Sequence, residues 1–136
     1  MKLVDYIALL VSARQQLQLM HWQTRSYANH KALGHAVDDL TGQIDKYVEV
    51  ACGAAGVHPE DLPLAGAIST ACSKLSSAKT TKQEAKQVSM LRIALSSGKT
   101  ISPEAAYIVD EIVGVLSRAE YLLAIEDGWK PATKKK

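Results

Sequence analysis

The sequence contains no phenylalanine, and tryptophan and tyrosine bring its aromatic content to only 5%. The hydrophobic core therefore has to be built from Leu, Ile, Val and Ala. This set suits helix packed on helix better than a β-sandwich. A chain of 136 residues is long enough to bury one sizeable core in one domain.

Cysteine and net charge are also low. The two cysteines, Cys52 and Cys72, form neither a CxxC motif nor a zinc-ligand spacing, so we expect reduced, packed thiols in a cytoplasmic protein. A formal net charge of +2 is too small to indicate nucleic-acid binding by itself. The apolar stretch at residues 7–11 is shorter than a membrane span and has no cleavage site, so we expect no membrane partner.

Apolar residues recur at helical spacing along four stretches, residues 3–24, 28–51, 83–96 and 103–127. Ser26 is predicted to cap the second helix, Gly53 and Gly56 to end it, and Gly98 to stop the third. Residues 57–81 are expected to be mostly loop, with one short helix near residues 68–75. The last helix is expected to bury a stripe of five residues: Ile108, Ile112, Val115, Leu122 and Ile125.

No strand is predicted, so the fold class is all-α, a four-helix bundle over residues 1–129 with a basic tail at residues 130–136. The tail lysines could attract DNA phosphates, especially when an oligomer presents many copies of them. These lysines are Lys130, Lys134, Lys135 and Lys136. An ordinary solvated chain end is the alternative interpretation.

The second predicted helix carries the residues with chemical potential. Asp45 and Glu49 are one helical turn apart and share a face, and His30 lies about 60° away around the same helix. Along the axis, His30 and Asp45 are separated by roughly 22 Å, so one ion cannot bind both within one subunit.

A second copy of the chain removes this difficulty. In a two-fold dimer with antiparallel helices, His30 of one copy would face Asp45 and Glu49 of the other, which gives two equivalent sites. His21 ends the first helix and could fold back near His30. Imidazole together with carboxylate suits iron, with zinc or manganese as alternatives.

The run Met20-His21-Trp22-Gln23-Thr24 resembles the end of the first helix in Dps proteins, the mini-ferritins of the ferritin-like superfamily. Residues 21–28 and 30–34 are similar to small phage-encoded Dps-like proteins. The resemblance is strong over residues 17–50, weaker over residues 104–126, and absent between them.

This resemblance implies a ferritin-like four-helix bundle with a ferroxidase centre between subunits, formed by His21, His30, Asp45 and Glu49. It implies oxidation of Fe(II) by peroxide or dioxygen, for iron sequestration and protection against oxidative stress. The expected protein is a homo-oligomer, either a dimer or a dodecameric shell, in the cytoplasm, or in the host cytoplasm if a phage encodes it.

The chain departs from the Dps pattern in three ways. Its two histidines are nine residues apart instead of twelve, and 136 residues is short for the family. Gly34 stands where many Dps proteins have an acidic ligand, and Asp38 is the candidate replacement on the same helix face. A ferritin-like structural or assembly protein of a phage, without catalysis, is therefore the main alternative.

Several other residues of types common in functional sites are expected to have structural or solvent-facing roles. Trp22 is predicted to be a packing anchor, with a redox role beside iron as the alternative. His35 and Asp39 are expected to face solvent, and His58 to be structural. Asp110 and Glu111 are expected to lie on a solvated face, although in a shell they could guide iron. No Glu-x-x-His motif occurs, which argues against a di-iron site inside the bundle.

Overall fold

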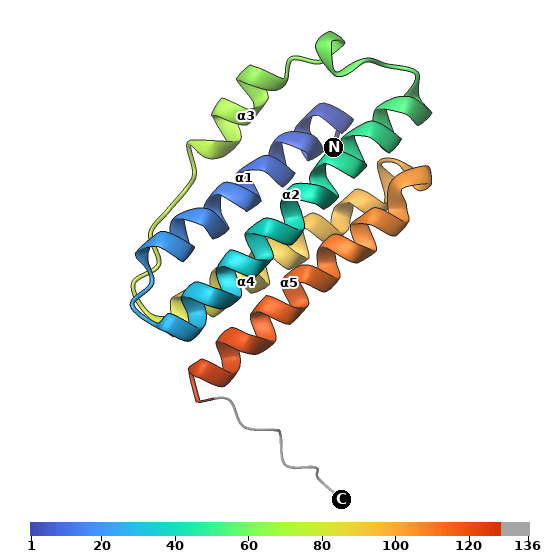
Figure 1. Cartoon of the computed structure of the whole chain (residues 1–136). Coiled ribbons are helices and arrows are strands. Elements are labelled where there is room, and N and C mark those ends of the chain that lie inside the picture. Colours follow the sequence, from blue (N-terminus) through green and yellow to red (C-terminus); the bar gives the residue numbers. More distant parts are fainter. Residues whose placement is uncertain (129–136) are drawn as a thin grey trace, which may run out of the picture.

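The computed structural model describes residues 1–128, and all regular secondary structure within them is helical (Figure 1). The α-helices are α1 (Leu3–Gln23), α2 (Tyr27–Ala55), α3 (Leu64–Cys72), α4 (Thr81–Leu95) and α5 (Ala106–Glu126). Short 3-10 helices cover Pro59–Asp61, Ser96–Thr100 and Pro103–Ala105. The predicted all-α class is confirmed. The basic tail with its four lysines lies outside the described residues, so DNA binding through it stays a prediction.

The four long helices lie side by side, and each contacts two of the others, in the order α1, α2, α5, α4 (Figure 1). α1 and α2 form an antiparallel pair, and so do α4 and α5. Between α2 and α4 the chain returns along the outside of α1, and this long connection contains α3. Within residues 1–128, no helix has both the length and the hydropathy needed to cross a membrane.

Local capping explains where several helices begin and end. The Ser26 side chain accepts a hydrogen bond from the Asn29 backbone N–H at 3.1 Å, which confirms the predicted cap of α2. α2 continues through Gly53 and ends at Gly56, whose φ of +68° suits the left-handed cap that glycine adopts without strain. α3 begins directly after Pro63, four residues earlier than predicted.

The core is mainly aliphatic, and two tyrosines meet near one end of the bundle, where α1 begins and α4 ends. The Tyr6 and Tyr47 rings contact edge to face, with centroids 5.1 Å apart, and both side chains are fully buried. The Tyr6 hydroxyl donates to the Leu95 carbonyl at 2.7 Å. Gly98 is buried against the Tyr6 ring, so a side chain there would collide with it. Gly98 was predicted as a helix stop, but the structure shows that it makes room for Tyr6.

The buried stripe of α5 differs from the prediction beyond Ile112. Val115 and Leu122 are only half-buried, and Ile125 is exposed. The side chains that enter the core are Ile108, Val109, Ile112, Leu116, Ala119 and Leu123. From Val109 onward the buried residues are spaced by three, four, three and four positions, as a helix of 3.6 residues per turn requires.

Tyr6 and Tyr47 should respond differently to loss of the hydroxyl group. Tyr6→Phe removes the bond to Leu95 and should lower the free energy of unfolding by about 1–2 kcal/mol. The Tyr47 hydroxyl is buried without a hydrogen-bond partner among the described residues, so Tyr47→Phe should leave the free energy unchanged or raise it slightly. Urea denaturation of both variants measures this difference, and equal losses would contradict it.

The same tyrosines predict a loss of stability at alkaline pH. Burial, followed by the nearby Cys52, raises the pKa of Tyr47 from 10.0 to about 12, and burial also raises the pKa of Tyr6. The unfolded chain therefore loses these phenol protons near pH 10 while the folded chain keeps them. Stability should be unaffected below about pH 10 and fall between about pH 10 and pH 12. Urea denaturation across this range should show a smaller fall for Tyr47→Phe than for the parent.

Candidate metal centre

His21 and His30 meet where α1 ends and α2 begins. Their rings stack with centroids 4.0 Å apart and an interplanar angle of 16°. The Nδ1 atom of His21 lies 2.6 Å from the backbone carbonyl oxygen of His30, and the Nδ1 atom of His30 lies 2.8 Å from the carbonyl oxygen of His21. The two residues therefore hold one another through a reciprocal pair of hydrogen bonds.

The position of these residues at the helix ends explains the arrangement. The carbonyl group of His21 lies in the last turn of α1, where a helix no longer supplies its own N–H donor. The His30 ring, which projects from the first turn of α2, supplies that donor. The pair thus ties the end of α1 to the start of α2 and fixes both rings.

The hydrogen bonds also determine which ring nitrogen remains free. A backbone carbonyl oxygen can only accept, so the Nδ1 atom of each histidine must carry the hydrogen. In the neutral ring, Nε2 then keeps its lone pair. Metal-binding histidines show this pattern, in which the second nitrogen donates to a carbonyl or carboxylate and orients the ring. The Nε2 atom of each neutral ring is thus the nitrogen that can bind a metal.

Gly34 leaves the space that the His21 ring occupies. A Cβ atom at position 34 would lie 2.8 Å from His21 Cε1 and 3.1 Å from its Nδ1. Any larger residue, including the acid found here in many Dps proteins, would displace the ring or the helix. Gly34 therefore leaves room for the stacked rings of His21 and His30 beside the short connector between α1 and α2.

The buried carboxylate of Glu84 stabilises the connector between α1 and α2. Glu84 on α4 is 2% exposed, and one of its oxygens accepts hydrogen bonds from Asn29 Nδ2 at 2.7 Å and Thr24 Oγ1 at 3.1 Å. Asn29 directly precedes His30, and Thr24 lies just beyond His21. Glu84 was not predicted to be part of the site from the sequence, although its spacing from Val88 places it on the buried stripe of α4.

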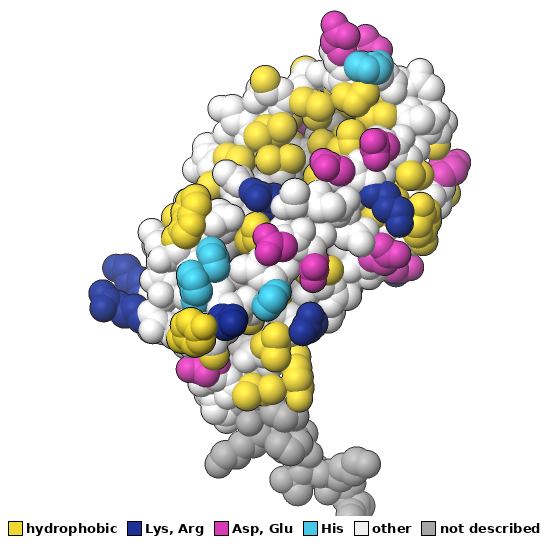
Figure 2. All heavy atoms as spheres, viewed as in Figure 1, with side chains coloured by type: hydrophobic (Ala, Val, Ile, Leu, Met, Phe, Trp, Pro, Cys, Tyr) yellow, Lys and Arg dark blue, Asp and Glu magenta, His cyan; other side chains and the backbone are white. Residues whose placement is uncertain are grey.

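The predicted carboxylate ligands lie elsewhere on α2. Asp38, Asp45 and Glu49 are exposed, and none makes an ion pair or side-chain hydrogen bond with another described residue. Figure 2 shows histidines and acidic side chains distributed along one face of the molecule. Among residues 1–128, no three His, Cys, Asp or Glu side chains come close enough to hold an ion within one chain.

The structure also shows the surroundings of the other residues for which the sequence suggested a role. Trp22 is 71% exposed, so the prediction that it anchors the packing of this chain is wrong. His35 and Asp39 are exposed, as predicted. His58 is structural, because its Nδ1 atom accepts from the Glu60 backbone N–H at the start of a 3-10 helix.

Two further predictions concern α5 and the cysteines. Asp110 and Glu111 are exposed, and Asp110 pairs with Lys99. Cys52 and Cys72 are both free, and burial raises the pKa of the Cys52 thiol. The Cys52 thiol is therefore not presented as a reactive thiolate.

Comparison with known proteins gives a family and a phage relative. The model of a family described as "Family of unknown function (DUF5856)" matches residues 21–123, which include His21, His30 and the three candidate carboxylates Asp38, Asp45 and Glu49. An "Uncharacterized 14.6 kDa protein in mobD-ri intergenic region" of Enterobacteria phage T4 is 28% identical over 123 residues. That match covers 90% of this chain and 88% of the phage protein. No solved structure matches the chain.

Two glycines of α2 provide a matched test of the space at position 34. Replacing glycine by alanine inside a helix normally stabilises it by up to about 1 kcal/mol. Gly42→Ala should show this gain, because nothing lies within 4 Å of the added Cβ. Gly34→Ala should instead lower the free energy of unfolding, because the new methyl group meets the His21 ring. If thermal and urea denaturation show the same gain for both variants, the proposed packing of His21 is wrong.

Proposed function

This chain belongs to the family of unknown function DUF5856, and we propose that it works as a Dps-like iron-binding protein. In this proposal it binds Fe(II) at a site shared by two copies of the chain and oxidises it with peroxide or dioxygen. The observation that carries the proposal is the histidine pair, in which backbone carbonyls hold both Nδ1 atoms and leave both Nε2 atoms free.

The donors around this pair suit iron once a second copy is added. Two imidazoles alone favour borderline metals such as zinc, whereas carboxylate oxygens favour harder ions and hold Fe(III) well. Asp45 and Glu49 are exposed and unpaired with described residues, so they are available to a partner. In an antiparallel pairing of α2 helices, they would reach His30 of the other copy.

The centre of such a pairing would lie near Asp38, midway between His30 and the two carboxylates. The Asp38 side chains of both copies would then approach one another, and their repulsion favours a cation nearby. Gly42 faces solvent, with no other atom within 4 Å of its Cβ position, and lets a second helix come close. The open surface at Gly42 supports self-association along this face of α2, and a bound cation would offset the repulsion between the two Asp38 carboxylates.

The connectivity of the helices is consistent with the ferritin-like part of the proposal. Ferritin-like bundles join two antiparallel helix pairs through one long crossover. The segment between α2 and α4 takes such a course along the outside of α1 (Figure 1). The relative in phage T4 agrees with the resemblance to small phage-encoded proteins and with a role in the cytoplasm of an infected host.

The chemistry requires the protein to bind Fe(II) and to stabilise Fe(III). Each Fe(II) gives up one electron, and one peroxide takes two electrons and two protons to become two water molecules. The histidines would hold the incoming Fe(II), and the carboxylates would stabilise the higher charge of the product. Consuming Fe(II) and peroxide together would suppress hydroxyl-radical formation.

One observation favours a second candidate function. The reciprocal hydrogen bonds of His21 and His30 already close the end of α1, so the pair has a structural use without a metal. In this alternative, the protein is a non-catalytic helical assembly protein. It keeps the fold and the self-association surface, and it neither binds nor oxidises Fe(II).

Anaerobic Fe(II) titration followed by peroxide separates the two candidates. The proposal predicts saturable binding at two equivalent sites per dimer, and oxidation faster than in the protein-free control. His30→Ala should abolish both properties, while His58→Ala, a matched change at an exposed histidine outside α2, should retain them. If the parent protein fails to bind Fe(II), the assembly function is favoured.

Mixing two inactive variants tests whether the site is shared. His30→Ala and Asp45→Asn should each be inactive alone. A mixed dimer contains one intact site, because the partner of each defective histidine also carries the defective carboxylate. Mixing by unfolding and refolding should therefore restore activity to about one quarter of the parent value, as random pairing of subunits predicts. No recovery in dimers shown to be mixed would contradict a shared site.

A further inference from the structure

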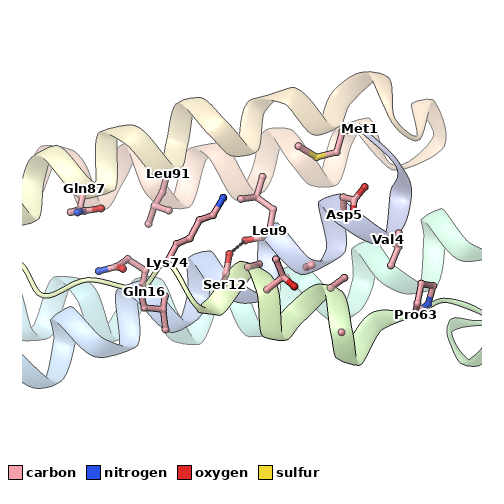
Figure 3. A pocket seen from close by; sticks show the side chains of 16 residues that line it. Met1, Val4, Asp5, Leu9, Ser12, Gln16, Pro63, Lys74, Gln87 and Leu91 are labelled. Atoms are coloured by element: carbon pink, nitrogen blue, oxygen red, sulfur yellow. Dashed lines mark hydrogen bonds between the residues drawn. The ribbon is translucent and has the colours of Figure 1, made fainter.

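A groove of about 760 Å³ lies between α1, α3 and α4 (Figure 3). Its lining is mainly apolar and includes Val4, Leu9, Ala67, Ala71 and Leu91. Neither His21 nor His30 is among the lining residues, so the groove is separate from the candidate metal centre. Its volume is in the range of small-molecule sites in proteins.

The packing of α3 explains why the groove exists. α3 packs against α1 but makes little contact with α4, and none of its own residues is fully buried. Apolar side chains on the facing sides of the three helices therefore remain partly uncovered.

The polar side chains around the groove differ in whether they already have partners. The Gln16 amide bonds both the N–H and the carbonyl of Ser76, and the Gln87 amide donates to the Ser76 hydroxyl. The side-chain ammonium of Lys74 has no hydrogen-bond or ion-pair partner among residues 1–128. In Figure 3 its side chain extends from beyond the end of α3 over the groove.

We infer that this groove binds a long-chain fatty acid, with its carboxylate on Lys74 and its acyl chain along Leu9 and Leu91. One ammonium group balances one negative charge, so a carboxylate fits better than a doubly charged phosphate. Asp5 lines the other end of the groove and repels an anion there, which fixes the orientation of the ligand.

The length of the groove favours a long chain over a short one. Its α1 lining runs from Val4 to Gln16, a distance of roughly 18 Å at the helical rise per residue. Apolar side chains from α3 and α4 flank this path on its other sides. Each methylene group that enters the groove adds to the binding free energy by leaving water. This inference does not depend on the proposed iron function.

Calorimetric titration with palmitate, below its aggregation concentration, tests the inference on the full chain. We expect saturable binding of one palmitate per chain. Lys74→Met keeps the length of the side chain but removes its charge, and should weaken binding about tenfold. Lys82→Met, an equivalent change at an exposed lysine of α4 outside the groove, should bind palmitate like the parent.

An uncharged analogue separates the contribution of the head group from that of the acyl chain. 1-Hexadecanol should bind the parent and Lys74→Met with equal affinity, since it carries no carboxylate. Failure of the parent to bind palmitate would overturn the proposal. Equal palmitate affinity of the parent and Lys74→Met would also overturn it, because the carboxylate would then not lie on Lys74.

Discussion

The structure of the candidate site depends on one interaction, the reciprocal hydrogen bonding of His21 and His30. Each imidazole donates through Nδ1 to the backbone carbonyl of the other residue, at 2.6 Å and 2.8 Å. The bonds join two helix ends, fix both rings in a stack and leave both Nε2 atoms free. The geometry that closes the connector therefore also leaves two imidazole nitrogens without a partner among the described residues.

Other features of the molecule are arranged around this interaction. Gly34 provides the space for the His21 ring, and buried Glu84 holds the connector through Thr24 and Asn29. The interior between the long helices has a different character. It is aliphatic around Tyr6 and Tyr47, and within residues 1–128 it offers no group of three potential metal ligands.

Much of the fold could be predicted from the sequence, because the helical periodicity was strong and the caps were local. The α2 cap at Ser26 and the extents of the long helices followed from those signals to within a few residues. Gly98 and the α5 stripe were misjudged for a common reason. A glycine packed under Tyr6 and a buried line beyond Ile112 depend on contacts between helices, which spacing along one helix does not reveal.

Of the four residues predicted for the site, the structure brings only His21 and His30 together within one chain. Spacing and resemblance indicated His21, His30, Asp45 and Glu49, and they required the carboxylates to come from a second copy. They did not reveal the reciprocal hydrogen bonds, and they presented Gly34 as a lost ligand. Only the three-dimensional structure shows that the absent side chain leaves room for His21. Trp22 was assigned to the core because tryptophan usually packs, yet it is exposed here.

The most direct test is a long-range ¹H–¹⁵N correlation spectrum of the two histidines in metal-free protein at about pH 8. The account predicts that both rings carry the hydrogen on Nδ1, and that added Zn²⁺, as a diamagnetic probe, shifts Nε2 of both. Hydrogen on Nε2 in either ring, or Nε2 signals that do not respond to Zn²⁺, would contradict the claim that the pair is prepared to bind metal.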